Sequence, residues 1–374
     1  KELLDVTKES GLQPAPEFLV KCIQLYEMTV VRHGMMLVGP TGGGKSRILR
    51  TLQAAMSRVK DDPAFERVRV YRCNPKAISM NQLYGAFDEQ TGEWTDGIAA
   101  VLIRHISQPN LEETGVTDAN IKWMAFDGPV DALWIENMNT VLDDNKKLCL
   151  NSGEIIPLSE TNTIMFEVED LAVASPATVS RNGMIYVEPP WSLPDRLDPT
   201  NASKTPLITS WLDALPPLLT PSRDGLAKLI DNYLVPCTEL VRLQLYQPVA
   251  AAPSNLVAAL LRMLEALLLP YWPQKDGSGN NVELDEAGEA REAALTEAAP
   301  KILEPTFFMA LTWSVGGTCD AAGRLKFDEL VRSLASEKGG VKGLPAGAGV
   351  SLYDCVYDAE KKLWVPWMKT VSRP

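Results

Sequence analysis

Short, continuous apolar runs recur along the first half of the chain, separated by segments whose apolar residues return every three or four positions. A continuous apolar run is typical of a strand buried on both faces, and the longer spacing is typical of a helix that covers it. This half therefore predicts an α/β fold, with a parallel sheet flanked by helices. The predicted strands are residues 34–39, 68–72, 121–126, 163–168 and 184–187.

Two helices and one insert complete the pattern of this half. Residues 17–31 and 46–59 carry apolar side chains at helical intervals, on either side of the first predicted strand. A turn at 151–153 separates two short apolar runs, which predicts a hairpin inserted between the third and fourth strands.

Beyond residue 187 the pattern changes to alternating helices without a convincing buried strand. We expect an α/β domain over residues 1–190, a smaller and mostly α-helical domain over 191–338, and a linker over 339–374 that starts the connection to a following domain. The linker begins in a glycine-rich stretch, and its aromatic tail at 353–367 predicts a short hairpin or a segment that docks on a neighbour.

Composition narrows the classes of partner. The net charge of −12 over 374 residues argues against binding of nucleic acid or anionic membrane. The most apolar stretch, 255–272, is too short and too charged to span a membrane. The 6 cysteines form no CxxC pair and only 2 histidines occur, so zinc sites and histidine-centred catalysis are disfavoured, and a reducing compartment is expected. Because the first residue is Lys1, we expect a piece of a longer polypeptide.

A glycine-rich motif follows the first predicted strand and opens the next predicted helix. It fits G-x-x-x-x-G-K-[ST], in which backbone amides surround phosphate groups and the helix N-terminus adds its positive dipole end. The lysine would reach the β- and γ-phosphates and the following hydroxyl would bind Mg²⁺. The predicted contacts to ATP or ADP are Gly39, Pro40, Thr41, Gly42, Gly43, Gly44, Lys45, Ser46 and Arg47.

Such a site needs an acidic residue at the end of a neighbouring strand to hold hydrated magnesium. Asp127 follows four apolar residues at the end of the third predicted strand, so Ser46 and Asp127 are the predicted Mg²⁺ ligands. The alternative is an ordinary strand-terminal aspartate that caps the turn at 128–129.

The residue after Asp127 indicates whether the site has a general base for ATP hydrolysis. Hydrolases of this class place a glutamate there to deprotonate water, whereas this chain has Gly128. Asp131 and Glu136 lie downstream, but we expect both on the following helix, facing solvent or a partner. The sequence therefore favours nucleotide binding without efficient turnover.

Arg181 lies between the fourth and fifth predicted strands. In a ring of such domains this region faces the nucleotide of the preceding neighbour, where a guanidinium can neutralise charge on a transferring phosphoryl group. The alternative is a surface arginine paired with a carboxylate.

Several longer stretches resemble the second AAA+ module of dynein heavy chains. The sequence at residues 31–34 and 42–44 is more similar to axonemal than to cytoplasmic dyneins. The stretches that carry the resemblance are 24–27, 31–42, 74–79, 83–85, 93–97, 126–131, 134–139, 141–146, 164–171, 177–184, 313–320 and 327–329.

The resemblance implies a six-module AAA+ ring that couples ATP hydrolysis to movement along microtubules in the axoneme of a cilium or flagellum. Implied partners are the neighbouring modules of the same heavy chain, microtubules through other parts of the motor, and other dynein chains. It also implies that this module binds nucleotide structurally and that Arg181 is an arginine finger for the first module. Glu169 departs from the polar sensor, commonly asparagine, of hydrolytic modules.

Two other functions fit the motif less well. A self-contained AAA+ ATPase that remodels other proteins would need a carboxylate at position 128. A small-molecule kinase would need an arginine-rich lid and a substrate pocket, and the helical half of the sequence shows neither.

Overall fold

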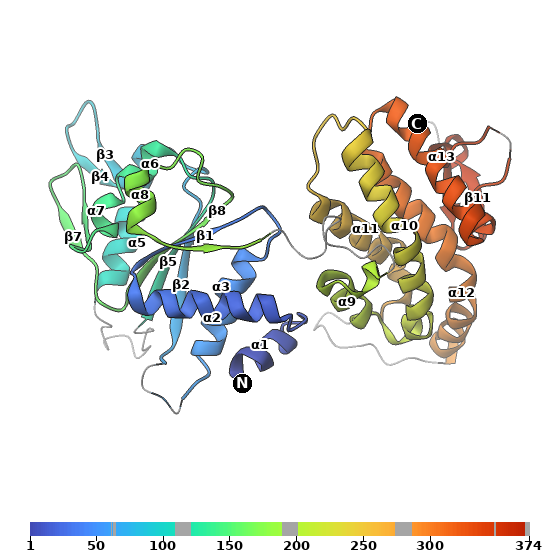
Figure 1. Ribbon diagram of the computed structural model, residues 1–374, viewed down its shortest axis with the longest axis horizontal. Helices are drawn as coiled ribbons and strands as arrows, with labels where there is room; N and C mark the ends of the chain where they lie inside the picture. The colour runs from blue at the N-terminus through green and yellow to red at the C-terminus, as the bar shows by residue number, and fades with distance from the viewer. Residues whose placement is uncertain are drawn as a thin grey trace. The chain divides into compact units, whose positions relative to one another are not determined.

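The computed structural model describes residues 1–60, 62, 65–108, 121–188, 201–273, 286–347 and 349–370. The chain divides into two compact units, Lys1–Pro190 and Trp191–Pro374. Figure 1 shows the first unit as a sheet with helices around it and the second as a group of helices. The predicted limit at residue 338 between a small domain and a linker is not tested by this division and stays a prediction.

The first unit is built around a five-stranded sheet in the order β2-β5-β8-β1-β9, with parallel pairing throughout. Each strand overlaps one of the runs predicted from apolar continuity, which confirms the parallel α/β fold. The strands are β1 Gly34–Val38, β2 Val68–Cys73, β5 Ile121–Asp127, β8 Asn162–Val168 and β9 Gly183–Tyr186.

Helices cover the two faces of this sheet. One face packs into a core with side chains of α5, α6 and α7, while α1, α2 and α3 pack against one another and α2 and α3 also contact the sheet. The helices of this unit are α1 Glu2–Glu9, α2 Pro16–Val31, α3 Lys45–Met56, α4 Met80–Tyr84, α5 Ile98–Ser107, α6 Ala132–Glu136, α7 Asn139–Leu142 and α8 Pro176–Arg181.

Two small hairpins extend from the unit. The predicted insert is present as β6 Lys147–Cys149 paired with β7 Ile155–Pro157. A second hairpin, β3 Gly85–Phe87 with β4 Trp94–Asp96, has no counterpart in the sequence prediction.

The second unit is helical and has its own apolar core, in which Tyr233, Phe307 and Phe308 pack ring against ring. The aromatic tail forms the predicted hairpin and contributes Tyr357 to this core. The elements are η2 Ala202–Lys204, α9 Pro206–Asp213, η3 Pro217–Ser222, α10 Arg223–Gln244, α11 Pro253–Leu267, η4 Leu269–Tyr271, α12 Glu286–Ser314, η5 Gly316–Thr318, α13 Ala321–Lys338, η6 Val341–Gly343, η7 Leu352–Asp354, β10 Cys355–Asp358, β11 Leu363–Pro366 and α14 Trp367–Thr370.

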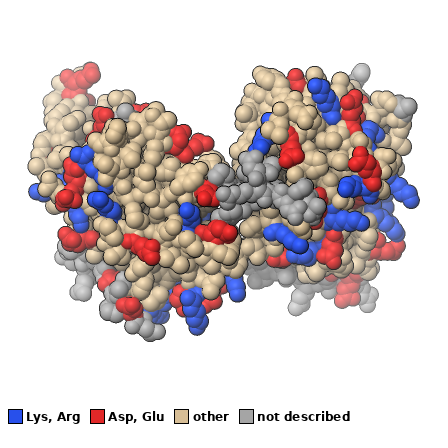
Figure 2. All heavy atoms as spheres, in the orientation of Figure 1, with Lys and Arg blue, Asp and Glu red and all other residues tan. Residues whose placement is uncertain are grey.

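Two features concern possible contact with a membrane: the length and apolar character of the helices, and the distribution of charged side chains on the surface. Among the described helices, none combines the length and apolar character needed to cross a bilayer. Figure 2 shows acidic and basic side chains interspersed over the face in view.

Candidate functional site

The glycine-rich motif forms a loop between β1 and α3, as the sequence predicts. A Cβ atom at Gly39 would overlap the carbonyl oxygen of Val187, so only glycine allows the loop to leave the strand this close to the neighbouring backbone. Gly44 has a φ of 96°, in the left-handed region, directly before α3 begins at Lys45. The loop therefore ends at a helix N-terminus, where backbone amides are unpaired within the helix.

Lys45 lies against the loop. Its Nζ donates to the carbonyl oxygen of Gly39 at 2.5 Å and to that of Pro40 at 3.1 Å. Burial lowers the pKa of this ammonium, and three nearby carboxylates act in the opposite direction, those of Glu167, Glu169 and Asp127. The ammonium is half-buried beside the amides of the loop, in a position to bind an anion that the loop encloses.

Ser46 contacts a residue that the motif did not indicate. Its hydroxyl donates to the Oε2 atom of Glu167, a residue in the interior of β8 whose side chain is 0% exposed. Strand register places Glu167 opposite Leu37 on β1 and opposite Asp127 on β5. Glu167 therefore stands between the strand that leads into the loop and the strand that ends in the predicted metal ligand.

Arg72, near the end of β2, completes a line of charges. Its Nη1 atom lies 2.9 Å from Oε1 of Glu167 and 3.5 Å from Oδ2 of Asp127. The side chain of Asp127 is 54% exposed. Ser46, Glu167, Arg72 and Asp127 thus form a contiguous row, which we call the carboxylate row, and it links the two predicted Mg²⁺ ligands.

Two atoms of this row have no hydrogen-bond partner among the described residues. They are Oε1 of Glu167, whose ion pair with Arg72 lacks hydrogen-bond geometry, and Nη2 of Arg72. Buried polar atoms without partners are uncommon and point to a missing ligand or ordered water. A hydroxyl and carboxylates are oxygen donors of the kind that magnesium prefers, so the residues present fit a Mg²⁺–nucleotide complex.

The other acidic residues near this edge of the sheet have structural partners. Asp131 accepts a hydrogen bond from the backbone of Leu133 at 2.8 Å, which caps α6, and it pairs with Lys76. This ion pair lowers the pKa of the Asp131 carboxyl. Glu136 is exposed at the end of α6.

Gly128 follows β5 and is tightly packed. A Cβ atom there would lie 2.9 Å from the side-chain oxygen of Asn74. The position where hydrolases carry a glutamate therefore provides no carboxylate, and any side chain there would have to displace the side chain of Asn74.

Arg181 is the last residue of α8 and has partners inside its own unit. It forms an ion pair with Asp143 and donates to the carbonyl oxygen of Ala177 at 2.9 Å. Its side chain remains 34% exposed. The alternative expected from the sequence, pairing with a surface carboxylate, is present, and any role outside this unit would require the pair with Asp143 to open.

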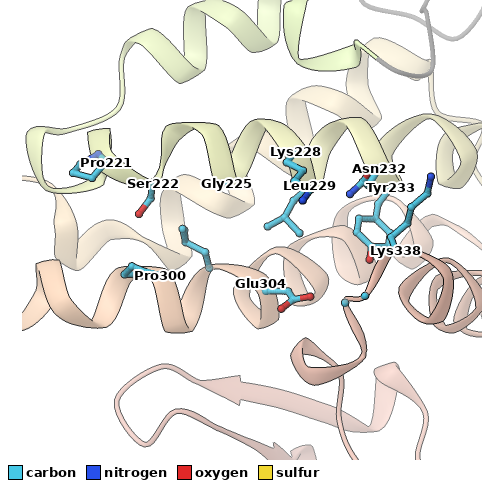
Figure 3. A pocket seen from close by; sticks show the side chains of 13 residues that line it. Pro221, Ser222, Gly225, Lys228, Leu229, Asn232, Tyr233, Pro300, Glu304 and Lys338 are labelled. Carbon is cyan, nitrogen blue, oxygen red and sulfur yellow. The ribbon is translucent and has the colours of Figure 1, made fainter.

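The helical unit contains a separate cavity of about 390 Å³. Figure 3 shows Lys228 and Asn232 on α10 and Glu304 on α12 along its lining, with Lys338 at the end of α13. Burial raises the pKa of the Glu304 carboxyl, against the effect of a nearby lysine. Two lysines and a glutamate give the cavity no strong preference for a polyphosphate, so the loop at Lys45 is the better candidate site.

Comparison with known families matches three parts of the chain, of which the first two overlap. Residues 1–46 match a family described as the hydrolytic ATP binding site of the dynein motor region, and residues 34–182 match the AAA domain of the dynein-related subfamily. Residues 226–369 match the dynein heavy chain AAA lid domain.

Individual relatives agree with these matches. The chain is 46% identical to human dynein axonemal heavy chain 1 over 88% of its own length and 7% of the relative. It is 41% identical to human dynein axonemal heavy chain 3 over 89% of its length and 8% of the relative. It is 37% identical to the dynein-1-beta heavy chain of the flagellar inner arm I1 complex of Chlamydomonas reinhardtii over 96% of its length and 8% of the relative.

The chain is an AAA+ module of the dynein heavy-chain family. It spans 7–8% of the length of these three relatives. The match to the hydrolytic site of the dynein motor ends at Ser46, before Asp127 and Gly128. That match therefore includes the glycine-rich motif of this dynein module but not the predicted magnesium ligand Asp127 or the residue that follows it.

Proposed function

We propose that this dynein module binds ATP or ADP with magnesium and retains it with little hydrolysis. The observation that carries the proposal is the complete phosphate loop between β1 and α3, with Lys45 on its inner side and Ser46 joined to the carboxylate row. Lys45 would hold the β- and γ-phosphates, and Ser46 and Asp127 would hold Mg²⁺. When bound, the metal would neutralise phosphate charge and fix its orientation.

Slow hydrolysis follows from the residues after β5. A general base contributes a factor of about 10²–10⁴ in rate, and position 128 provides none. Asp131 is occupied by Lys76 and by the cap of α6. Glu169, exposed after β8, stands where hydrolytic modules carry a polar sensor. Nucleotide in this site would therefore act as a structural brace.

Arg181 would act in trans as an arginine finger on the nucleotide of the preceding module. Its guanidinium stays planar and charged, and it is partly exposed at the end of a short helix. If the Arg181 guanidinium moved from Asp143 to a phosphoryl oxygen, it would exchange one ionic partner for another.

The likeness to axonemal heavy chains supports a place for the module in a motor that acts on microtubules in a cilium or flagellum. We propose that it is the second module of a six-module ring, with neighbouring modules and other dynein chains as its partners. A self-contained remodelling ATPase is disfavoured by Gly128.

Photolabelling of the full motor with azido-ATP distinguishes nucleotide retention from ATP hydrolysis. A label on the α-phosphate reports bound nucleotide, and a label on the γ-phosphate reports ATP that has not been hydrolysed. Peptide mass spectrometry then reads label on this module alone. We expect both labels on this module, with the γ label lost about 100-fold or more slowly than the motor turns over ATP. Equal rates would contradict the retention proposal, and absence of both labels would contradict nucleotide binding.

The finger role is tested by Arg181→Ala in the full motor. We expect the ATPase rate at the neighbouring site to fall about 10³-fold, with labelling of this module unchanged. Asp143→Asn is the matched control, because it removes the partner of Arg181 within this unit and leaves the guanidinium in place. An equal loss in both variants, or loss of labelling here, would contradict a role in trans.

A further inference from the structure

We infer that Glu167 is a positioning residue for magnesium, which orients the Ser46 hydroxyl and sets the metal dependence of nucleotide binding. This inference rests on the proposed nucleotide site and adds a residue that the phosphate-loop motif does not contain. The observation is the juxtaposition of a fully buried carboxylate on β8, a hydroxyl in the first turn of α3 and a guanidinium on β2, which reaches Glu167 past the intervening strand β5.

The first step concerns the direction of the Ser46 hydrogen bond. A serine hydroxyl has one proton and two lone pairs, and a metal ion can bind only through a lone pair. Because the proton of Ser46 is donated to Glu167, the lone pairs face away from that carboxylate. Glu167 therefore fixes the rotation of the hydroxyl that would otherwise be free to turn its proton toward a cation.

The second step concerns charge. An ionised carboxylate that accepts from a metal-binding hydroxyl makes the oxygen a better ligand, as outer carboxylates do for metal-bound histidines. Glu167 is the penultimate residue of β8, whose residues are all buried, and it is flanked by Phe166 and Val168. Burial of a charge at this depth is costly, and a core packing role would be served better by an apolar side chain.

The third step concerns Arg72. Its Nη1 atom lies 2.9 Å from Oε1 of Glu167 and 3.5 Å from Oδ2 of Asp127, so its positive charge offsets both carboxylates. It approaches Oε1 of Glu167, whereas Ser46 donates to Oε2. Its second nitrogen, Nη2, and Oε1 of Glu167 have no hydrogen-bond partner in the described part of the chain. Both atoms are buried, and a buried polar atom without a partner points to a bound water or ligand that would complete the arrangement.

The experiment measures azido-nucleotide labelling of this module in the full motor, across a titration from chelated to excess Mg²⁺. In Glu167→Ala we expect the Mg²⁺ concentration for half-maximal labelling to rise about 10–100-fold, the usual effect of removing an outer carboxylate. Labelling under chelation should equal or exceed that of the unaltered motor, because a negative charge near the phosphates is gone. Glu167→Gln keeps an acceptor for Ser46 without the charge and should give a smaller shift.

The control is Glu160→Gln, which removes one negative charge from the exposed turn that precedes the same strand and should not change the Mg²⁺ titration. An unchanged Mg²⁺ requirement in both Glu167 variants would overturn the positioning role. Equal loss of labelling with and without Mg²⁺ would also overturn it, since that result indicates a structural role. Absence of labelling in the unaltered motor is a distinct result, and it overturns nucleotide binding itself.

Discussion

Buried polar side chains differ in kind between the two units. In the described part of the α/β unit they include two charged residues, Lys122 and Glu167, on adjacent strands of the sheet. In the described part of the helical unit they are hydroxyls only: Thr205, Ser222, Thr238, Ser254, Thr306, Thr312 and Ser314. Several of these hydroxyls donate to a carbonyl one turn earlier in their own helix.

The difference agrees with the proposed placement of the nucleotide site in the α/β unit. A hydroxyl that donates to a carbonyl of its own helix already has a hydrogen-bond partner and does not require a ligand. A buried carboxylate with an unpartnered oxygen, such as that of Glu167, costs stability that packing must offset, and it is retained where a ligand uses it. Four changes test this contrast, ordered by the free energy we expect each to cost.

The largest effect is expected in the helical core. Phe308→Ala removes a fully buried ring that packs on Tyr233 and Phe307, and we expect a loss of about 3–5 kcal/mol in the free energy of unfolding of this unit. Hydrogen exchange of peptides from α10 and α12 measures it. Leu325→Ala is the matched control, because this leucine is 62% exposed and its loss should change stability by about 0.5 kcal/mol or less.

A buried ion pair and a surface ion pair give the second comparison. Arg72→Met leaves Glu167 in the sheet without its cation, and we expect the α/β unit to lose about 2 kcal/mol or more. Arg223→Met breaks the exposed pair with Asp213 in the helical unit and should cost about 1 kcal/mol or less. Denaturant unfolding followed by unit-specific hydrogen exchange compares the two. Equal losses would remove the proposed distinction between the units.

The third change addresses binding rather than folding. Lys45→Ala removes charge-assisted hydrogen bonds to phosphate, and we expect nucleotide affinity to fall by about 2–3 kcal/mol, roughly 30–150-fold. Photolabelling of this module measures the loss. Lys228→Ala alters the cavity of the helical unit in Figure 3 and should leave labelling unchanged. If Lys228→Ala were the more damaging of the two, the nucleotide would belong to the helical unit.

The smallest effect is expected from Thr312→Val. Its hydroxyl donates to the carbonyl oxygen of Phe308 at 2.7 Å, and valine keeps nearly the same shape. The loss should be about 1 kcal/mol or less in the free energy of unfolding. A loss above about 3 kcal/mol would show that hydroxyls in the helical core do more than satisfy their own helix.

Much of the fold can be predicted from the sequence because strands buried on both faces leave continuous apolar runs. The hairpin β3–β4 left no such signal: its strands have three residues each, and Phe87 is 52% exposed. The length of α12 is equally hard to read from the pattern, since its start is rich in glutamate and alanine whereas Phe307 and Phe308 near its end are buried.

The site could be predicted only where a motif has fixed spacing. The loop from Gly39 to Ser46 is contiguous in sequence, so its residues were found together. Glu167 and Arg72 are brought to the loop by strand register, which motif spacing does not encode. One signal was present, because Glu167 interrupts the apolar run of residues 164–168, and a glutamate in such a run is seldom there for packing.

The approach of Gly39 to Val187 has a mechanical consequence. Val187 donates its backbone amide to the carbonyl oxygen of Val38 at 2.7 Å, so the start of the phosphate loop and the segment that leaves β9 are joined through main-chain atoms. Glu188 is the last described residue before the helical unit begins. A shift of the backbone at Val187 would therefore also displace the start of the phosphate loop, because a hydrogen bond and a close main-chain contact hold the two together.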